Sequence, residues 1–551
     1  MATLTRQRRR GTGGIKHAAP AIYLALGIIV AAFALPSALR PPPDPANQSG
    51  ALDPNAPPKN NPDQIIQSLH QAGGGGAGAS GDGGNGAPPT TIAPVASVNR
   101  CYGNPPRQIP SVYAGPCVGA WHGNNGGSTS KNVTGTEIHI IVSNAGAPAE
   151  GRVPDPSTNN ASTSAGTITW QVLTQYFNEH YQLYGRKVVF YGEGGPSQDT
   201  DSSYAASAKT ASDTYHGFAF MTPYVGECQD FVRDGLVAMC DPLAHQQYLD
   251  QRPGMFSIQM DIDEQLAMGA EFTCKSLVGG TAKYGGSSVQ TKTRKIAFMG
   301  WESIRGGAPA DHFNSQLKQQ CGQTADLRQL NGPNDVSGAA AAVSRFAADN
   351  DTTVVFANQG VNVLAAMQAA SSIGYYPEWV SLGGYADDTN LIGTVFPKDQ
   401  SAHLFGFVTV QWAQKVAEKE CNKAYHTIDP NNDPDNGVCD GFWVMSVLAL
   451  NGIQGAGPNL TPASFQQGMY AAGHRFGLAP YMMGGGFGPD DYSYIDDQAL
   501  AWWSSTATDP ENGSPGAYVF THGGHRFQRG QLPAGDGEFF SSGSVEAPEQ
   551  W

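Results

Sequence analysis

The sequence contains few residue patterns that could carry out catalysis. It has no H-E-x-x-H pair, no G-x-S-x-G nucleophile turn and no Walker loop. Oxygen-bearing side chains alternate at Asp429, Asn431, Asp433 and Asp435, as calcium ligands do. Pro434 stands where a calcium loop needs glycine, and no glutamate follows at the twelfth position. A surface turn and a calcium site are the two interpretations of this stretch.

His522 and His525, separated by two glycines, form a second short pattern. The pair could hold a metal ion, and a glycine-rich turn is the other interpretation. Since no further catalytic signature is present, we expect a binding protein rather than an enzyme, and no cofactor.

The composition of the chain limits the kinds of partner that it can bind. The chain has 551 residues, which is room for two or three compact domains. Lys and Arg number 32 against 47 Asp and Glu, so the formal net charge is −15 at pH 7. Because phosphate binding needs clustered cations, this balance speaks against a nucleic-acid partner.

Eight cysteines follow residue 100, and none belongs to a C-x-x-C pair. Disulfides in an oxidising compartment are therefore favoured over a zinc knuckle. If each cysteine pairs with the next one in the sequence, every disulfide cross-links a single local stretch of the chain. We expect the bonds Cys101–Cys117, Cys228–Cys240, Cys274–Cys321 and Cys421–Cys439.

The N-terminus combines a basic segment with an apolar run. Residues 1–20 carry arginines and a lysine but no acid, and residues 21–39 contain no charge. The run approaches the ~20 residues that cross a bilayer as a helix. It is either an uncleaved transmembrane anchor or a signal peptide cut near Ala32 to Ala34. Both interpretations place the globular part outside the cell membrane, tethered or secreted.

Residues 40–98 are rich in proline and glycine and contain no Phe, Trp or Tyr. Such a segment cannot bury enough apolar surface to offset the entropy of ordering its chain. We predict a disordered linker here.

Beyond residue 134, strand and helix patterns alternate. Residues 137–143 form a β-rich run, and 168–185 place Trp170, Phe177 and Tyr181 at helical spacing. The alternation predicts βαβ units with parallel strands, in more units than one small sheet accommodates. An α/β fold with two lobes follows. Further strands are expected at 187–191, 218–221, 236–239, 296–299, 353–357 and 379–382, and helices at 337–348 and 361–374.

Several stretches look like those of one known family, in the same order. They are 143–146 (SNAG), 184–188 (YGRKV), 220–226 (FMTPYVG), 238–242 (AMCDP), 255–259, 295–300, 366–377 and 440–453. Together they resemble the type I periplasmic binding proteins, in the branched-chain amino-acid and amide branch of ABC transporter substrate-binding proteins.

The resemblance implies two doubly wound parallel-sheet lobes joined by a hinge, preceded by the membrane-spanning helix and the linker. We expect these parts: 1–20 cytoplasmic; 21–39 anchor or signal peptide; 40–98 linker; 99–133 a disulfide-stapled prefix; 134–257 with 386–480 lobe 1; 258–385 with 481–530 lobe 2; and 531–551 a C-terminal tail.

A ligand site is expected where the strands end, because ligands of open α/β sheets bind outside the carboxyl ends of the strands. Tyr224, Trp301 and Tyr385 could enclose an apolar or planar group, and Glu302 or Asp241 could pair with an ammonium group. Core packing for Trp301 and a chain turn for Asp241 are the alternatives. The candidate ligand residues are Ser143, Asn144, Thr222, Tyr224, Asp241, Trp301, Glu302, Asn358, Gln359 and Tyr385.

The resemblance implies an extracytoplasmic solute-binding protein that captures an amino acid, amide or related compound between its lobes. Its partners would be the small-molecule ligand, the permease of an ABC transporter, and the membrane through the N-terminal helix. The alternative is a ligand-sensing ectodomain that works through a partner signalling protein.

Overall fold

The computed structural model describes residues 101–546, except 144–146, 155–163, 199, 241–243, 303–304, 306, 333–334, 358–359, 385–386, 411–412, 480 and 536. The chain divides into one unit at Met1–Asp82 and a second at Gly83–Trp551, and all described residues belong to the second. The predicted cytoplasmic segment, apolar run and linker all lie outside the described residues. Among those that are described, no helix is long and apolar enough to span a membrane.

The first sheet has six strands in the order β2-β3-β1-β4-β5-β6, and only β2 runs antiparallel to its neighbour. Counted along the chain, its parallel strands follow the order 2-1-3-4-5, which is that of flavodoxin-like doubly wound sheets. The order reverses between β1 and β4. The strands are β1 Glu137–Ser143, β2 Gly151–Arg152, β3 Lys187–Glu193, β4 Ala219–Thr222, β5 Val237–Cys240 and β6 Met255–Ser257.

The second sheet repeats this order in its parallel strands β8-β7-β9-β10-β11 and adds β12, β13 and β14 antiparallel. The predicted α/β class is therefore confirmed, with a second sheet that is mixed. Its strands are β7 Ile296–Trp301, β8 Asp326–Leu330, β9 Thr353–Ala357, β10 Glu378–Ser381, β11 Leu404–Val408, β12 Gln498–Thr508, β13 Pro515–Phe520 and β14 Arg526–Phe527.

Strand β11 corrects the expected division of the chain, which assigned residues 386–480 to lobe 1. β11 pairs with β10 on one side and β12 on the other, so residues 404–408 belong to the second sheet. All five residues of β11 are buried, as expected of a strand in the interior of a sheet. The remaining boundaries stay predictions.

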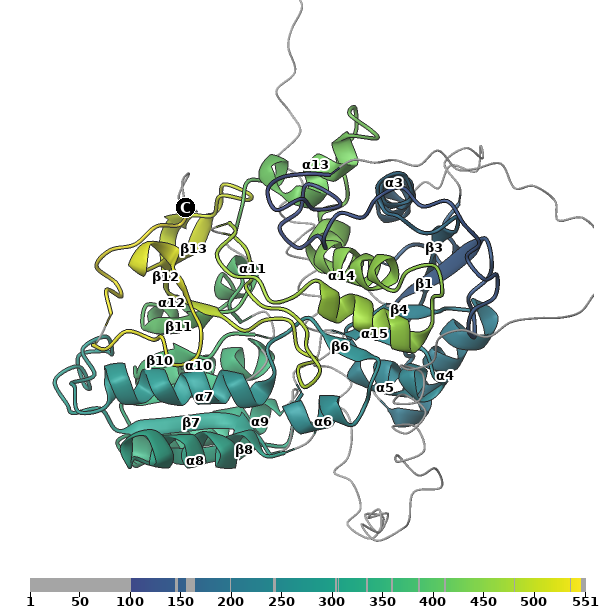
Figure 1. Cartoon of the computed structure of the whole chain (residues 1–551). Helices are drawn as coiled ribbons and strands as arrows, with labels where there is room; N and C mark the ends of the chain where they lie inside the picture. The colour runs from purple at the N-terminus through teal and green to yellow at the C-terminus, as the bar shows by residue number, and fades with distance from the viewer. Residues whose placement is uncertain are drawn as a thin grey trace, which may run out of the picture. The chain divides into compact units, whose positions relative to one another are not determined.

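Helices pack in pairs around the two sheets (Figure 1): α4 against α5 and α14 against α15 around the first, α7 against α8 and α9 against α10 around the second. The helices are α3 Ala165–His180, α4 Asp201–Lys209, α5 Val225–Arg233, α6 Gln246–Asp250, α7 Ile262–Phe272, α8 Pro309–Cys321, α9 Val336–Ala348, α10 Gly360–Ile373, α11 Asn390–Gly393, α12 Lys398–Ser401, α13 Glu420–His426, α14 Asn436–Gly455 and α15 Pro462–Ala471.

The core of the first sheet is aromatic. Trp170 and Phe177, on the predicted helical stripe, are fully buried in α3, and the Trp170 ring lies 4.8 Å from that of Phe190 on β3. Phe465 of α15 lies 5.9 Å from Phe218, which immediately precedes β4. α15 is thereby held against the first sheet, although it follows β11 in the chain.

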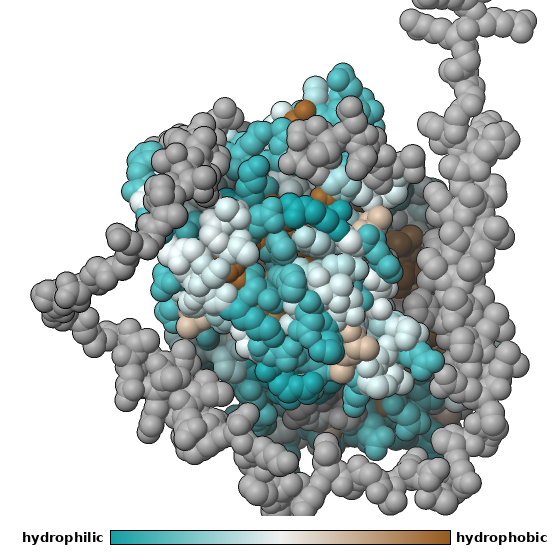
Figure 2. All heavy atoms as spheres, turned by 90° about the vertical axis from the view of Figure 1, so that its right-hand side faces the viewer, coloured by the Kyte–Doolittle hydropathy of each residue, from teal (hydrophilic) through white to brown (hydrophobic). Residues whose placement is uncertain are grey.

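The face shown in Figure 2 is mainly hydrophilic where residues are described, with hydrophobic residues in small patches.

The disulfides are those expected from neighbour pairing: Cys101–Cys117, Cys228–Cys240, Cys274–Cys321 and Cys421–Cys439. The prefix that holds the first bond packs onto the late helices. The N–H of Gly115 donates to Asn451 of α14 at 2.7 Å, and the Ser111 hydroxyl donates to Glu420 of α13 at 2.6 Å.

Candidate functional site

Ser143 and Thr222 lie side by side at the carboxyl edge of the first sheet. β1 and β4 pair with Val142 opposite Met221, so the residues that end these strands are neighbours. Both side chains are fully buried. The Ser143 hydroxyl oxygen lies 3.2 Å from Oε2 of Glu227, and the Thr222 hydroxyl donates to the same oxygen. Two predicted ligand residues therefore meet at the point where the strand order reverses.

Glu193 is a carboxylate of this cluster that the sequence analysis did not select. It ends β3 directly opposite Ser143. Its Oε2 accepts hydrogen bonds from the Ser207 hydroxyl at 2.8 Å and the Gly195 N–H at 2.7 Å, and lies 3.1 Å from the Ser143 hydroxyl. It was missed because β3 continues past its predicted end at Tyr191. A search extended to the next charged residue after that strand would have found it.

Glu227, in the first turn of α5, is the second carboxylate of the cluster and is fully buried. Burial raises its pKa to about 7; the hydroxyls of Ser207 and Thr222 act against this rise, and the charge of Glu193 adds to it. Its Oε1 has no hydrogen-bond partner among the described residues. No sequence signal marks this glutamate, because only the packing of α5 against the strand ends brings it here.

Tyr224 supplies an aromatic surface next to these groups. It caps the start of α5, and its backbone N–H donates to the Thr222 hydroxyl at 3.1 Å. Its half-buried ring lies 6.0 Å from that of Tyr204 on α4. The backbone of Tyr224 thus lies at the carboxyl edge, and the role of its ring in ligand binding stays a prediction.

At the end of β7 in the second sheet, Trp301 is buried whereas the next residue, Glu302, is exposed. Trp301 ends β7 with only 7% of its surface exposed, and its indole N–H donates to Asn362 of α10 at 3.2 Å. Glu302 has an exposed side chain, and its backbone N–H donates to Leu330 at the end of β8. Trp301 therefore has a clear packing role, which was the alternative considered for it.

The other candidate ligand residues lie outside the described part of the chain: Asn144, Asp241, Asn358, Gln359 and Tyr385.

Asp388 joins the carboxyl ends of β10 and β11. Its Oδ2 accepts hydrogen bonds from the Thr409 N–H at 2.7 Å, the Thr409 hydroxyl at 2.5 Å and the Gly384 N–H at 3.1 Å. The neighbouring Asp387 is buried, and burial together with the charge of Asp388 raises its pKa well above the usual range. Buried carboxyl groups therefore lie beyond the carboxyl ends of strands in the second sheet, as they do in the first.

A further set of acids lies where the chain passes between the sheets. Burial and the charges of neighbouring acids raise the pKa of Asp496 to about 10 and that of Glu264 to about 7. His474 lies within 2.8 Å of Asp491 and 3.6 Å of Asp496. Repulsion among these acids is relieved by protonation, so this region is charged less at neutral pH than its composition suggests.

The two short patterns of the sequence have structural roles. Asp429 accepts from the N–H of Asn431 at 3.2 Å, and Asp435 caps the start of α14, as the turn interpretation predicts. His522 and His525 lie in a turn between β13 and β14, and both rings contact that of Phe527.

No protein-family model matches the sequence, and no protein of curated function matches it. Solved structures do resemble it, and many of them are leucine/isoleucine/valine-type binding proteins. They are substrate-binding proteins of ABC transporters. This is the group that the sequence resembles.

Three of these structures illustrate the likeness. A branched-chain amino-acid ABC transporter protein from Thermus thermophilus with bound valine is 14% identical over 72% of this chain and 97% of its own, with a TM-score of 0.49. A solute-binding protein from R. palustris in complex with 4-hydroxybenzoate is 10% identical over 72% and 98%, with a TM-score of 0.48. A substrate-binding protein from Desulfitobacterium hafniense in complex with Leu is 14% identical over 70% and 100%, with a TM-score of 0.45. The 2-1-3-4-5 order of the parallel strands in both sheets is that of a doubly wound α/β fold.

Proposed function

We propose that this chain is an extracytoplasmic solute-binding protein that captures a small molecule at the carboxyl ends of its strands and delivers it to an ABC transporter. One observation carries the proposal: both sheets have the 2-1-3-4-5 order, and the buried hydroxyls and carboxyls of the first converge where that order reverses. Polar groups gathered at such a point are what a small-molecule site needs.

The ligand class follows from the carboxyl groups. Glu193 and Glu227 lie around the Ser143 hydroxyl without a lysine or arginine hydrogen-bonded to either in the described residues. A cationic ligand group, such as the ammonium of an amino acid or an amine, would supply the missing charge, and Oε1 of Glu227 would accept its hydrogen bond. We therefore infer a ligand with a positively charged nitrogen, next to an apolar or planar part held by Tyr224.

The assignment of Trp301 and Tyr385 to the opposite wall remains part of the proposal, as do the hinge between lobes, the permease partner and a membrane anchor in residues 21–39. Export is supported by the four disulfides, which persist in oxidising compartments.

The experiment is a thermal-shift screen of the full chain against amino acids, amines, amides, aromatic acids and sugars, followed by calorimetry of each compound that raises the melting temperature. A ligand that binds the folded chain but not the unfolded chain raises the apparent stability of the protein by mass action. We expect amino acids or amines to act, and we expect Glu227→Gln and Tyr224→Ala to weaken binding at least tenfold. Glu179→Gln, on the exposed face of α3, is the matched control and should leave binding unchanged.

Two outcomes would count against the proposal. If no compound of any class shifts the melting temperature, solute binding itself is rejected. If a ligand binds equally well to Glu227→Gln and Tyr224→Ala, the function stands but the site lies elsewhere.

A further inference from the structure

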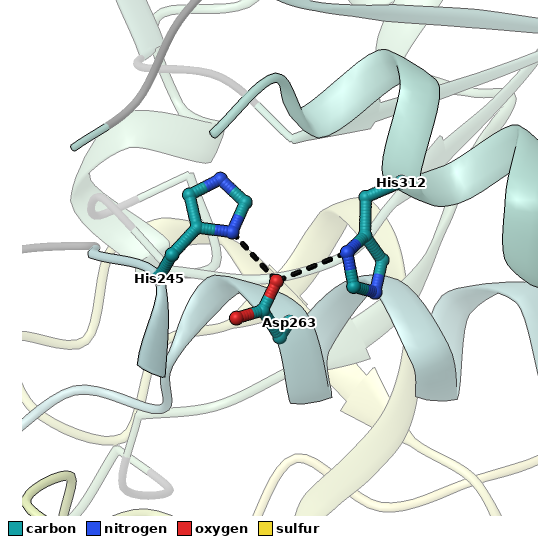
Figure 3. Close-up of side chains that lie close together, drawn as sticks. All are labelled: His245, Asp263 and His312. Atoms are coloured by element: carbon teal, nitrogen blue, oxygen red, sulfur yellow. Dashed lines mark hydrogen bonds and ion pairs between the residues drawn. The ribbon is translucent and has the colours of Figure 1, made fainter. Parts of the chain in front are cut away.

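Two imidazoles converge on one carboxylate in a part of the fold that the proposed ligand site does not use. Nδ1 of His245 lies 2.6 Å from Oδ1 of Asp263, and Nδ1 of His312 lies 3.1 Å from the same oxygen. One ligand-type atom from each of the three residues lies within 4.8 Å of the others. Figure 3 shows both rings turned toward the carboxylate from opposite sides.

Three separate segments bring these side chains together. His245 directly precedes α6, Asp263 is in the first turn of α7, and His312 is near the start of α8. The N–H of His245 donates to the carbonyl of Arg305, ahead of α8, at 2.9 Å. The cluster thus joins the segment after β5, in the first sheet, to helices that pack beside the second.

The positions of α7 and α8 relative to each other are covalently restrained. Cys321 is the last residue of α8, and Cys274 lies in the turn that continues α7 without a break. The two helices also pack along their length. Asp263 and His312 are therefore held at a fixed separation, which is the preorganisation that a metal site requires.

Space for a further ligand is present beside the cluster. A groove of about 400 Å³ is lined by the three residues together with Gln247, Gly307, Ala308 and Asp311. Gly307 allows the His245 ring to sit close to it, since a Cβ there would lie 2.9 Å from Nε2. His245 is 4% exposed, and its Nε2 has no hydrogen-bond partner among the described residues. Its ring orientation is therefore set from the Nδ1 side, by Asp263.

We propose that His245, Asp263 and His312 bind one divalent cation of the zinc type through the two Nδ1 atoms and the Asp263 carboxylate, with water from the groove in the fourth position. The proton that each Nδ1 directs at Asp263 in the metal-free chain is then carried on Nε2 of the same ring, which leaves Nδ1 free to coordinate. Ligands of tetrahedral zinc at ~2.0–2.1 Å lie about 3.3 Å apart. The two nitrogens lie 2.6 and 3.1 Å from Oδ1 of Asp263, and ligand atoms of all three residues lie within 4.8 Å of one another, so binding would bring them to that common spacing. Two imidazole nitrogens favour zinc or another late transition metal over calcium and magnesium, which prefer oxygen ligands.

Nε2 of His312 already has a neighbour that can support this coordination. It lies 3.3 Å from the amide of Gln316, one turn further along α8. A half-turn of that amide lets its oxygen accept the Nε2 proton of a metal-bound ring, and such outer contacts fix the orientation of metal-binding histidines.

The test uses the full chain, stripped of metal with a chelator, dialysed against Zn²⁺ and assayed for bound metal by mass spectrometry. We expect one Zn²⁺ per chain, a rise in melting temperature, and retention in the presence of excess Ca²⁺ and Mg²⁺. His245→Gln, His312→Gln and Asp263→Asn should each weaken zinc binding on the order of 100-fold. Asp263→Asn keeps the shape of the side chain, so it separates lost charge from lost folding.

His474→Gln is the matched control, because His474 with Asp491 and Asp496 forms the other group that could hold a metal in the described part of the chain. It should leave zinc binding unchanged. Cobalt supplies a second readout: Co²⁺ bound by two imidazoles and a carboxylate gives visible absorption that Asp263→Asn should abolish while circular dichroism stays unaltered. The proposal is rejected if the wild-type chain retains no zinc, if the three variants retain it, or if only His474→Gln loses it.

Discussion

The hydroxyl oxygen of Ser143, at the end of β1, lies 3.2 Å from Oε2 of Glu227 on α5, and both side chains are fully buried. A serine hydroxyl has one proton to donate, and Glu193 lies equally close on its other side. Each carboxyl also accepts from other groups, Glu227 from the Thr222 hydroxyl and Glu193 from the Ser207 hydroxyl and the Gly195 N–H. These donors are uncharged, so two neighbouring buried carboxyls make the edge of the first sheet sensitive both to pH and to a cation.

The first prediction concerns pH. The folded-state pKa of Glu227, about 7, lies above its ordinary value of 4.5, so the folded chain binds this proton more tightly than the unfolded chain. The resulting stabilisation is complete below pH ~4.5 and is lost as pH rises through about 7. We expect Glu227→Gln to remove this loss, worth up to about 3 kcal/mol at pH 8, and to change little at pH 4.5.

Urea unfolding of the full chain at both pH values measures this difference, with Glu179→Gln as the exposed control. A Glu227→Gln effect that is the same at pH 4.5 and pH 8 would show that Glu227 does not titrate in this interval.

The second prediction concerns the ion pair of Arg294 and Glu378 at the other end of the second sheet. Its atoms approach to 2.7 and 2.9 Å, and both side chains have no exposed surface. Arg294→Met would leave a buried carboxylate without its countercharge, and we expect a loss of about 3–5 kcal/mol in unfolding free energy. The double variant Arg294→Met with Glu378→Leu should recover most of the lost unfolding free energy, because no unpaired charge then remains in the interior.

Lys131→Met provides the comparison, because Lys131 and Asp234 are 3.6 Å apart and each about half exposed. Its loss should stay within ~1 kcal/mol. Equal losses for the buried and the exposed pair would contradict the argument from desolvation.

The third prediction concerns disulfides. Cys274 and Cys321 are 47 residues apart, and Cys228 and Cys240 are 12 apart. In the loop-entropy account, replacing the first pair by serine costs about 4 kcal/mol and the second about 3 kcal/mol. Thermal unfolding of the two double variants should reproduce this order. The reverse order would indicate that effects in the folded state, and not loop length, decide the contribution of each bond.

The fourth prediction concerns two glycines. A Cβ on Gly192, next to Glu193 in β3, would lie 2.0 Å from the carbonyl oxygen of Pro148, whereas a Cβ on Gly441 of α14 meets no atom within 4 Å. We expect Gly192→Ala to destabilise the chain by about 1–3 kcal/mol. Gly441→Ala should stabilise it by ~0.5–1 kcal/mol, because alanine loses less backbone entropy in a helix. Denaturant midpoints of both variants test this contrast, and a stable Gly192→Ala chain would refute the close approach.

Local patterns in the sequence predicted much of the fold. The run at 137–143 is strand β1 with the same bounds, because its four β-branched residues, three of them consecutive at 140–142, suit a strand whose second half is buried on both faces. Trp170 and Phe177 face the core as their helical spacing indicates. Strands β11 and β12 were not predicted. Gly406 interrupts the apolar run of β11, and β12 follows a long irregular segment and pairs with β11, which lies far earlier in the chain.

The sequence by itself determined the alternation of strands and helices, the neighbouring disulfide pairs and the hydroxyls of Ser143 and Thr222 at strand ends, because each depends on residues close together in the chain. Only the tertiary structure decided which charged side chains meet them. Glu227 reaches Ser143 from a helix 84 positions away, and Asp263 meets histidines from two other segments. Such contacts between distant residues depend on how helices pack against strands and against each other, and no local pattern in the sequence indicates that packing.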